Sequence, residues 1–173
     1  MTAYEAVVYD LDGTVVSLDV DWATVATDVL EVYAEANIDP PGRDLWDLLE
    51  ASASVGLAAK VEAAIADHER AGARASRRLA RADELERRPV PVGVCSLNCE
   101  AACEIALETH DIRSGVDAVV GRDTVRTRKP HPEPLLETVD RLGAIPSKTV
   151  FIGDSARDEQ TAERAGTAFE WVD

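Results

Sequence analysis

The amino-acid sequence predicts an α/β fold: a Rossmann-like parallel sheet with helices on both faces, plus a small all-helical cap inserted after the first strand. Two observations lead to this prediction. Short apolar runs alternate with helical patterns over the C-terminal half of the chain, a spacing typical of a mostly parallel sheet. Between Val16 and Pro89 the alternation stops, and only helical patterns follow one another.

Five short apolar runs are the predicted strands: residues 6–9, 91–95, 116–120, 149–152 and 168–172. Helices are predicted between the later strands, over residues 100–109, 134–142 and 158–165. In the inserted segment a helix is predicted over 22–36, and after the break NIDPPG two more over 43–53 and 57–88, the last interrupted near Gly72. We therefore expect a Rossmann-like core of residues 1–16 and 89–173 and a helical cap of residues 17–88.

Length and charge narrow the class of protein. The 173 residues suit one domain with an insertion, and 46% of them are hydrophobic, as in globular proteins. No apolar run approaches the roughly 20 residues of a membrane helix, and no basic-then-apolar leader opens the chain, so a cytoplasmic protein is expected. The net charge of −15 argues against nucleic acid or a membrane as main partner. Such acidic, lysine-poor chains are typical of salt-loving microbes, and we expect a halophilic monomer or homodimer.

Two other sets of residues have simple interpretations. Cys95, Cys99 and Cys103 form no CxxC pair, which favours small buried thiols over a metal site. Five arginines share a face if residues 57–88 form one helix: Arg70, Arg74, Arg77, Arg78 and Arg81. We expect them to pair with nearby acidic residues on a solvated helix; steering of anions or self-association is the alternative.

Polar residues follow four of the apolar runs. The segment DLDGT places Asp10, Asp12 and Thr14 after the first strand, SLN places Ser96 and Asn98 after the second, RTRKPHPEP contains Lys129, and GDSARD contains Asp154 and Asp158. Parallel strands all end at one edge of the sheet, where ligands bind, so these side chains should gather there. Individually each has an ordinary alternative: DLDGT as a turn, Ser96, Asp154 and Asp158 as helix caps, and Lys129 as a surface lysine.

Together these residue types fit phosphoryl transfer through an aspartyl-phosphate. A carboxylate that attacks phosphorus needs a cation beside it, and Mg²⁺ takes oxygen ligands such as Asp10 and Asp154. Lys129 can neutralise charge on the transferring oxygens, while the Ser96 hydroxyl donates a hydrogen bond. Asp12 can protonate the leaving oxygen and later deprotonate the attacking water.

The order and spacing of these four segments resemble the haloacid dehalogenase superfamily, in its phosphoglycolate-phosphatase-like branch with a short helical cap. The resemblance implies Asp10 as nucleophile and metal ligand, and Asp12 as general acid/base whose backbone carbonyl also reaches the metal. It implies Asp154 as a Mg²⁺ ligand and Asp158 as a ligand through water or as the residue that holds Lys129. Substrate binding is assigned to Thr14, Ser96, Asn98 and Lys129.

The expected function is Mg²⁺-dependent hydrolysis of a small phosphorylated metabolite. A phosphomutase of the same superfamily, or a non-catalytic binding or regulatory protein that retains the fold, is the alternative. A response-regulator receiver is disfavoured, because its lysine comes last whereas Lys129 precedes the final acidic pair. Asp12 also favours phosphoryl chemistry over cleavage of a carbon–halogen bond, which does not need a second aspartate in the first motif.

Overall fold

The computed structural model describes residues 4–172, and its centre is a five-stranded, entirely parallel sheet with strand order β5-β4-β1-β6-β7. The strands are β1 (Ala6–Tyr9), β4 (Val92–Cys95), β5 (Ala118–Val120), β6 (Thr149–Gly153) and β7 (Ala168–Trp171). Each lies within two residues of a predicted strand, so the predicted α/β fold is confirmed.

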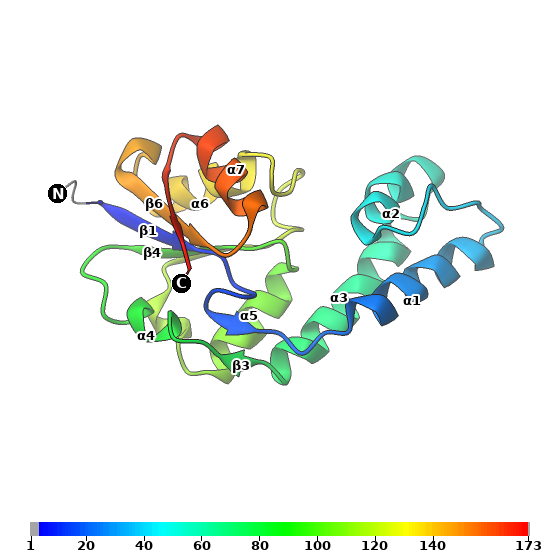
Figure 1. Ribbon diagram of the computed structural model, residues 1–173, viewed down its shortest axis with the longest axis horizontal. Coiled ribbons are helices and arrows are strands. Elements are labelled where there is room, and N and C mark those ends of the chain that lie inside the picture. The colour runs from blue at the N-terminus through cyan, green and yellow to red at the C-terminus, as the bar shows by residue number, and fades with distance from the viewer. Residues whose placement is uncertain (1–3, 173) are drawn as a thin grey trace.

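Successive residues of β1 point to opposite faces of the sheet, and each face is covered by helices. Val7 and Tyr9 pack into the apolar cluster formed with α5 (Glu100–Thr109), whereas Val8 packs into the cluster formed with α6 (Glu133–Arg141) and α7 (Ala156–Ala165). Figure 1 shows α5 on one side of the strands and α6 and α7 on the other. Burial on both faces explains why the strands read as continuous apolar runs rather than alternating ones.

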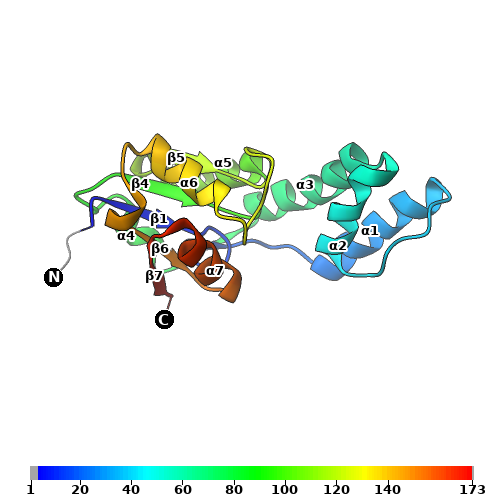
Figure 2. The same ribbon diagram turned by 90° about the horizontal axis from the view of Figure 1, so that it is seen from above.

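Three helices form the cap: α1 (Trp22–Glu35), α2 (Leu45–Ser52) and α3 (Ala58–Arg74). They enclose a small apolar cluster of their own, in which the Tyr33 hydroxyl donates a 2.6 Å hydrogen bond to the Leu48 carbonyl. The side chains of Asp21 and Asp44 cap α1 and α2. The cap extends away from the sheet, and the C-terminal end of α3, which is the end nearer the sheet, lies against α5 (Figures 1 and 2).

The chain passes between core and cap twice, and the two passages pair with each other. Strand β2 (Val16–Ser17) runs antiparallel to β3 (Arg77–Arg78), and the Asp19 N–H donates to the Gly72 carbonyl at 3.1 Å. Short helical turns complete the fold: α4 (Ala82–Leu85), η1 (Ala53–Val55), η2 (Arg113–Gly115) and η3 (Pro146–Lys148). No helix among residues 4–172 has both the length and the apolar character needed to cross a membrane.

The helix predicted over 57–88 ends at Arg74, close to the interruption predicted near Gly72, and its predicted continuation beyond that point is wrong except for the short helix α4. The backbone leaves the helix there because Arg77 and Arg78 pair with β2, a tertiary contact that outweighs local helix propensity. The shared face of five arginines is lost with the helix. Arg70 instead pairs with Asp67 and Arg81 with Glu84, so local ion pairing is the part of that interpretation that is confirmed.

Candidate active site

Three carboxylates meet at the C-terminal edge of the sheet. Asp10 follows β1, and Asp154 and Asp158 follow the neighbouring strand β6. One oxygen from each lies within 4.8 Å of the others, an arrangement that could hold a metal ion. Oxygen-only donors of this kind suit a hard divalent cation.

Lys129 reaches into this cluster from the loop that follows β5. Its Nζ donates to Asp10 Oδ1 at 2.7 Å, to Asp158 Oδ1 at 2.6 Å and to the Cys95 carbonyl at 3.2 Å. The side chain is only 3% exposed, so the alternative of an ordinary surface lysine is wrong. The ammonium offsets part of the negative charge that the carboxylates concentrate here.

Two glycines let the carboxylates approach the backbone. A Cβ on Gly13, which has a φ of +87°, would lie 2.1 Å from Asp154 Oδ2. A Cβ on Gly153 would lie 2.7 Å from the Cβ of Asp158. Both positions need glycine because a side chain there would occupy the space that the acidic residues fill.

Helix capping in this region belongs to other residues. Ser155 is the N-cap of α7, since its side chain accepts from the Asp158 N–H, and its hydroxyl also donates to Asp158 Oδ2 at 2.7 Å. Helix α5 begins after Cys99. The helix-cap interpretations of Ser96, Asp154 and Asp158 are therefore wrong, and Asp158 is free to hold Lys129.

Burial shapes the protonation of the site. It raises the pKa of Asp10 to about 7, although the Lys129 ammonium opposes the shift. Burial lowers the pKa of Lys129, but the Asp10 and Asp158 carboxylates more than reverse that, leaving it above its ordinary value. Burial likewise raises the pKa of Asp154. One lysine does not neutralise all of these carboxylates, so a further positive charge would stabilise their ionised forms. A divalent metal ion would supply that charge.

Asp12 lies beside the cluster but outside the group of three. It lines the same cavity of about 170 Å³ as Asp10, Lys129 and Asp154. Its Oδ1 accepts a 2.9 Å hydrogen bond from the Leu18 N–H, in the passage that leads to the cap, and burial raises its pKa. Asp12 therefore presents a carboxyl group to the same cavity as Asp10 without joining the carboxylate cluster.

The remaining predicted residues, Thr14, Ser96 and Asn98, are all buried. Ser96 is 2% exposed and donates to Asn98 Oδ1 at 3.0 Å, and the Asn98 N–H donates back to Ser96 Oγ. Asn98 also lines the cavity. Thr14 is fully buried, and its hydroxyl has no hydrogen-bond partner within residues 4–172. Their assignment to substrate binding stays a prediction.

A buried ion-pair network, which sequence reasoning missed, joins the cap to the loops after β4 and β5. Glu69 of α3 is fully buried and accepts from the Cys99 N–H at 3.0 Å, from Asn98 Nδ2 at 3.2 Å and from Arg122 Nη1 at 2.6 Å. Arg122 also pairs with Glu62 and donates to the Leu97 carbonyl. One signal was available: Val61, Ile65 and Glu69 are spaced by four, which places a carboxylate on an apolar helix face.

We expect the variant Arg122→Gln to destabilise the protein by about 3–5 kcal/mol, because it leaves the Glu69 carboxylate buried without its guanidinium. Urea unfolding measures this loss. The double variant Glu69→Gln/Arg122→Gln should lose clearly less than the sum of the single variants. As a matched control, Arg70→Gln removes an exposed pair with Asp67 and should cost under about 1 kcal/mol. An equally small loss for Arg122→Gln would contradict the expectation.

All three cysteines are free and buried, as predicted for small core thiols. Cys95 ends β4, and Cys103 lies in α5 under the sheet. Burial raises the pKa of each thiol above its ordinary value. They take no part in the carboxylate cluster.

A family model for haloacid dehalogenase-like hydrolases matches residues 7–172 of the chain. The chain belongs to this family. The matched range of this haloacid dehalogenase-like hydrolase includes all four segments that carry the predicted site residues. The family match confirms the resemblance inferred from the sequence.

Named relatives point to one branch of the family. The chain is 37% identical to a phosphoglycolate phosphatase of Escherichia coli (strain K12) over 82 residues, which are 47% of this chain and 32% of that protein. It is 48% identical over 60 residues to a phosphoglycolate phosphatase of Salmonella choleraesuis, covering 35% and 24% of the two chains. The matched segments therefore span less than a third of the length of each of these two curated relatives.

A solved structure shares the fold over nearly the full chain. The crystal structure of a putative phosphoglycolate phosphatase from Lactobacillus plantarum superposes with a TM-score of 0.71 at 24% identity, covering 99% of this hydrolase and 86% of that chain. At this identity the likeness supports the fold. It extends through the helical cap as well as the sheet.

Proposed function

We propose that this protein hydrolyses phosphomonoesters of small phosphorylated metabolites through an aspartyl-phosphate formed on Asp10. The observation that supports this most directly is the placement of Asp10. It ends the central strand within hydrogen-bonding distance of Lys129 and within 4.8 Å of two further carboxylates. The phosphoglycolate phosphatases among its relatives are consistent with a small phosphorylated substrate.

The proposed reaction has two steps. In the first, a carboxylate oxygen of Asp10 forms a bond to phosphorus, the bond between phosphorus and the leaving oxygen breaks, and Asp12 protonates that oxygen. In the second, Asp12 takes a proton from water as the water attacks phosphorus, which frees Asp10 and releases phosphate. Lys129 offsets the charge on Asp10 and on the phosphoryl group throughout.

We propose Mg²⁺ as the cofactor. Asp10 and Asp154 would hold it, with Asp158 acting through water and the Asp12 backbone carbonyl completing the protein's contribution. When bound, the ion supplies positive charge that reduces repulsion between carboxylate and phosphate. Cytoplasmic placement and adaptation to concentrated salt remain predictions from composition.

We expect chelation with EDTA to remove hydrolysis of an aryl phosphate, and added Mg²⁺ to restore it. Asp154→Asn should raise the Mg²⁺ concentration for half-maximal activity more than about tenfold, because a charged oxygen ligand is lost. Asp140→Asn, an exposed aspartate on α6, is the control for loss of one negative charge and should behave like the unmodified protein. Undiminished hydrolysis after thorough chelation would refute the metal requirement.

A further inference from the structure

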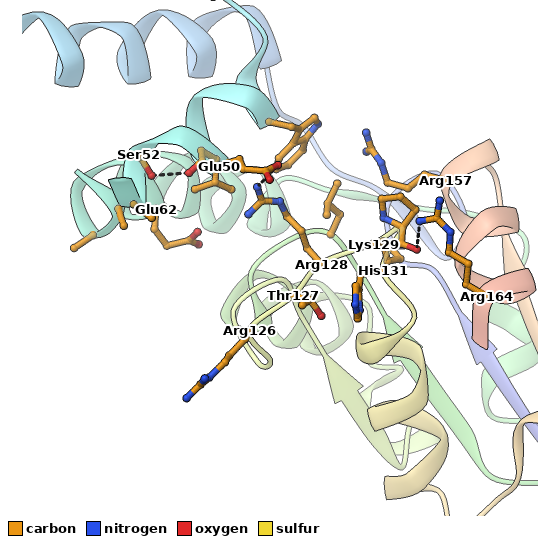
Figure 3. Close-up of a pocket in the computed structure, with 17 residues that line it drawn as sticks. Glu50, Ser52, Glu62, Arg126, Thr127, Arg128, Lys129, His131, Arg157 and Arg164 are labelled. Carbon is orange, nitrogen blue, oxygen red and sulfur yellow. Dashed lines mark hydrogen bonds and ion pairs between the residues drawn. The ribbon is translucent and has the colours of Figure 1, made fainter. Parts of the chain in front are cut away.

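A second, larger cavity adjoins the proposed phosphoryl site. It has a volume of about 830 Å³ and lies between the cap and the core (Figure 3). The two cavities share four lining residues: Trp46, Leu97, Lys129 and Arg157. A phosphomonoester whose phosphate reaches Asp10 can therefore extend its leaving group into the larger space.

The walls of this cavity differ sharply in character. On the cap side they are mostly apolar, with Trp46, Leu49, Ala53, Ala58 and Ala59 beside the polar residues Glu50, Ser52 and Glu62. On the core side they are cationic: the lining as a whole contains five of the 18 lysines and arginines of the chain but only two of its 33 acidic residues. In a protein of net charge −15 this concentration of positive charge favours an anion.

Three of these cations have little or no neutralisation by carboxylates of the protein. Within residues 4–172, neither Arg157 nor Arg164 has a carboxylate within salt-bridge distance; Arg157 lies over the Trp46 ring and Arg164 donates to the Pro130 carbonyl at 3.1 Å. Arg128 has one partner, Glu50, at 3.5 Å, and the Glu50 side chain is 83% exposed. Such an exposed pair contributes little and can be exchanged for a ligand.

Figure 3 shows how these side chains lie. Arg128 points towards Glu50 of the cap, Arg157 and Arg164 lie on the other side of the segment that carries Lys129, and Arg126 points away from all three. Arg128 comes from the loop before Lys129, and Arg157 and Arg164 come from the first and last turns of α7. Guanidinium groups of this kind recognise phosphate and carboxylate through paired N–H donors.

Resting on the proposed function, we propose that the substrate carries a second anionic group, a phosphate or a carboxylate, which one of the arginines of this larger cavity, Arg128 or Arg164, binds at the far side of the leaving group. The volume has room for a leaving group well beyond a two-carbon acid, because cavities of about 300–1,000 Å³ take ligands of drug size. The apolar side chains of the cap wall can cover the carbon skeleton, and Arg157 lines both cavities.

Matched substrates test this proposal on the purified full chain with Mg²⁺. Fructose 1,6-bisphosphate against fructose 6-phosphate isolates a second phosphate, and 3-phosphoglycerate against glycerol 3-phosphate isolates a carboxylate. We expect kcat/KM to be about 10- to 100-fold higher for the more anionic member of at least one pair, the range for a charged hydrogen bond. The pair that shows the preference identifies the anion, and its better member should also exceed phosphoglycolate.

The arginines are tested by the same ratio. Either Arg128→Gln or Arg164→Gln should reduce the preference for the more anionic substrate, mainly through a higher KM, and the variant that does so identifies the arginine that binds the second anion. An unchanged preference in both variants would overturn the inference. Arg74→Gln, at the exposed end of α3, removes the same charge and should leave the ratio and the basal activity unchanged.

Equal kcat/KM within both pairs, or a preference for phosphoglycolate over every larger substrate, would overturn this inference while the phosphatase assignment stands. Absence of turnover with all substrates, an aryl phosphate included, would overturn the proposed function and this inference with it.

Discussion

Asp10→Asn should abolish hydrolysis of every phosphomonoester, with kcat falling by a factor on the order of 10⁴ or more. An amide is a poor nucleophile towards phosphorus, so no aspartyl-phosphate can form. The carbonyl oxygen of asparagine can still accept the hydrogen bond from Lys129, which is 2.7 Å from Asp10 Oδ1. The fold should therefore survive, and the loss should appear as chemistry rather than as unfolding.

Phosphate release from alkyl and aryl substrates measures this loss, with circular dichroism and thermal unfolding as checks on the fold. Asp140→Asn on the exposed side of α6 again controls for the change in charge. If Asp10→Asn retained more than about a hundredth of the activity, Asp10 could not be the sole nucleophile, and the aspartyl-phosphate mechanism would have to be abandoned.

Asp12→Asn should instead act selectively. An alkyl phosphate needs its leaving oxygen protonated, so its turnover should fall by the 10²–10⁴-fold that is typical of lost general acid catalysis. An aryl phosphate leaves well without that proton, so the first step should suffer less. The second step still lacks a base to activate water, and phosphorylated Asp10 should accumulate.

Acid-quenched samples of the Asp12→Asn variant, digested and analysed by mass spectrometry, should carry phosphate on the peptide that contains Asp10. The double variant Asp10→Asn/Asp12→Asn is the matched control and should carry none. Equal losses for alkyl and aryl substrates without a trapped phosphopeptide would show that Asp12 is not the acid/base.

The sheet and the cluster around Asp10 could be predicted because their signals are local. Apolar runs marked each strand, and one or two polar residues after each run marked the edge, so strand order was not needed to bring Asp10, Lys129 and Asp154 together. Their four-part order along the chain then pointed to a single family.

The passage between cap and core could not be predicted in the same way. Strand β3 consists of Arg77 and Arg78, two exposed residues whose only reason to be extended is their pairing with β2. Gly72 indicated an interruption of the helix close to this point, but nothing local indicated a strand, because the partner residues Val16 and Ser17 lie about sixty residues earlier in the chain. Glu69 was missed for a related reason: its partners Asn98, Cys99 and Arg122 come from distant loops.

The network of Glu69 and Arg122 also limits how this protein can be recombined with its relatives. The Glu69 carboxylate of α3 accepts hydrogen bonds from Asn98, from the Cys99 N–H and from Arg122. The cap therefore cannot be exchanged as an independent module, because cap and core complete each other's hydrogen bonds. A chimera with a foreign cap would leave Arg122 buried without a carboxylate partner, and one with a foreign core would leave Glu69 buried without a cation. Only grafts that keep α3 together with the loops that carry Asn98, Cys99 and Arg122 should fold.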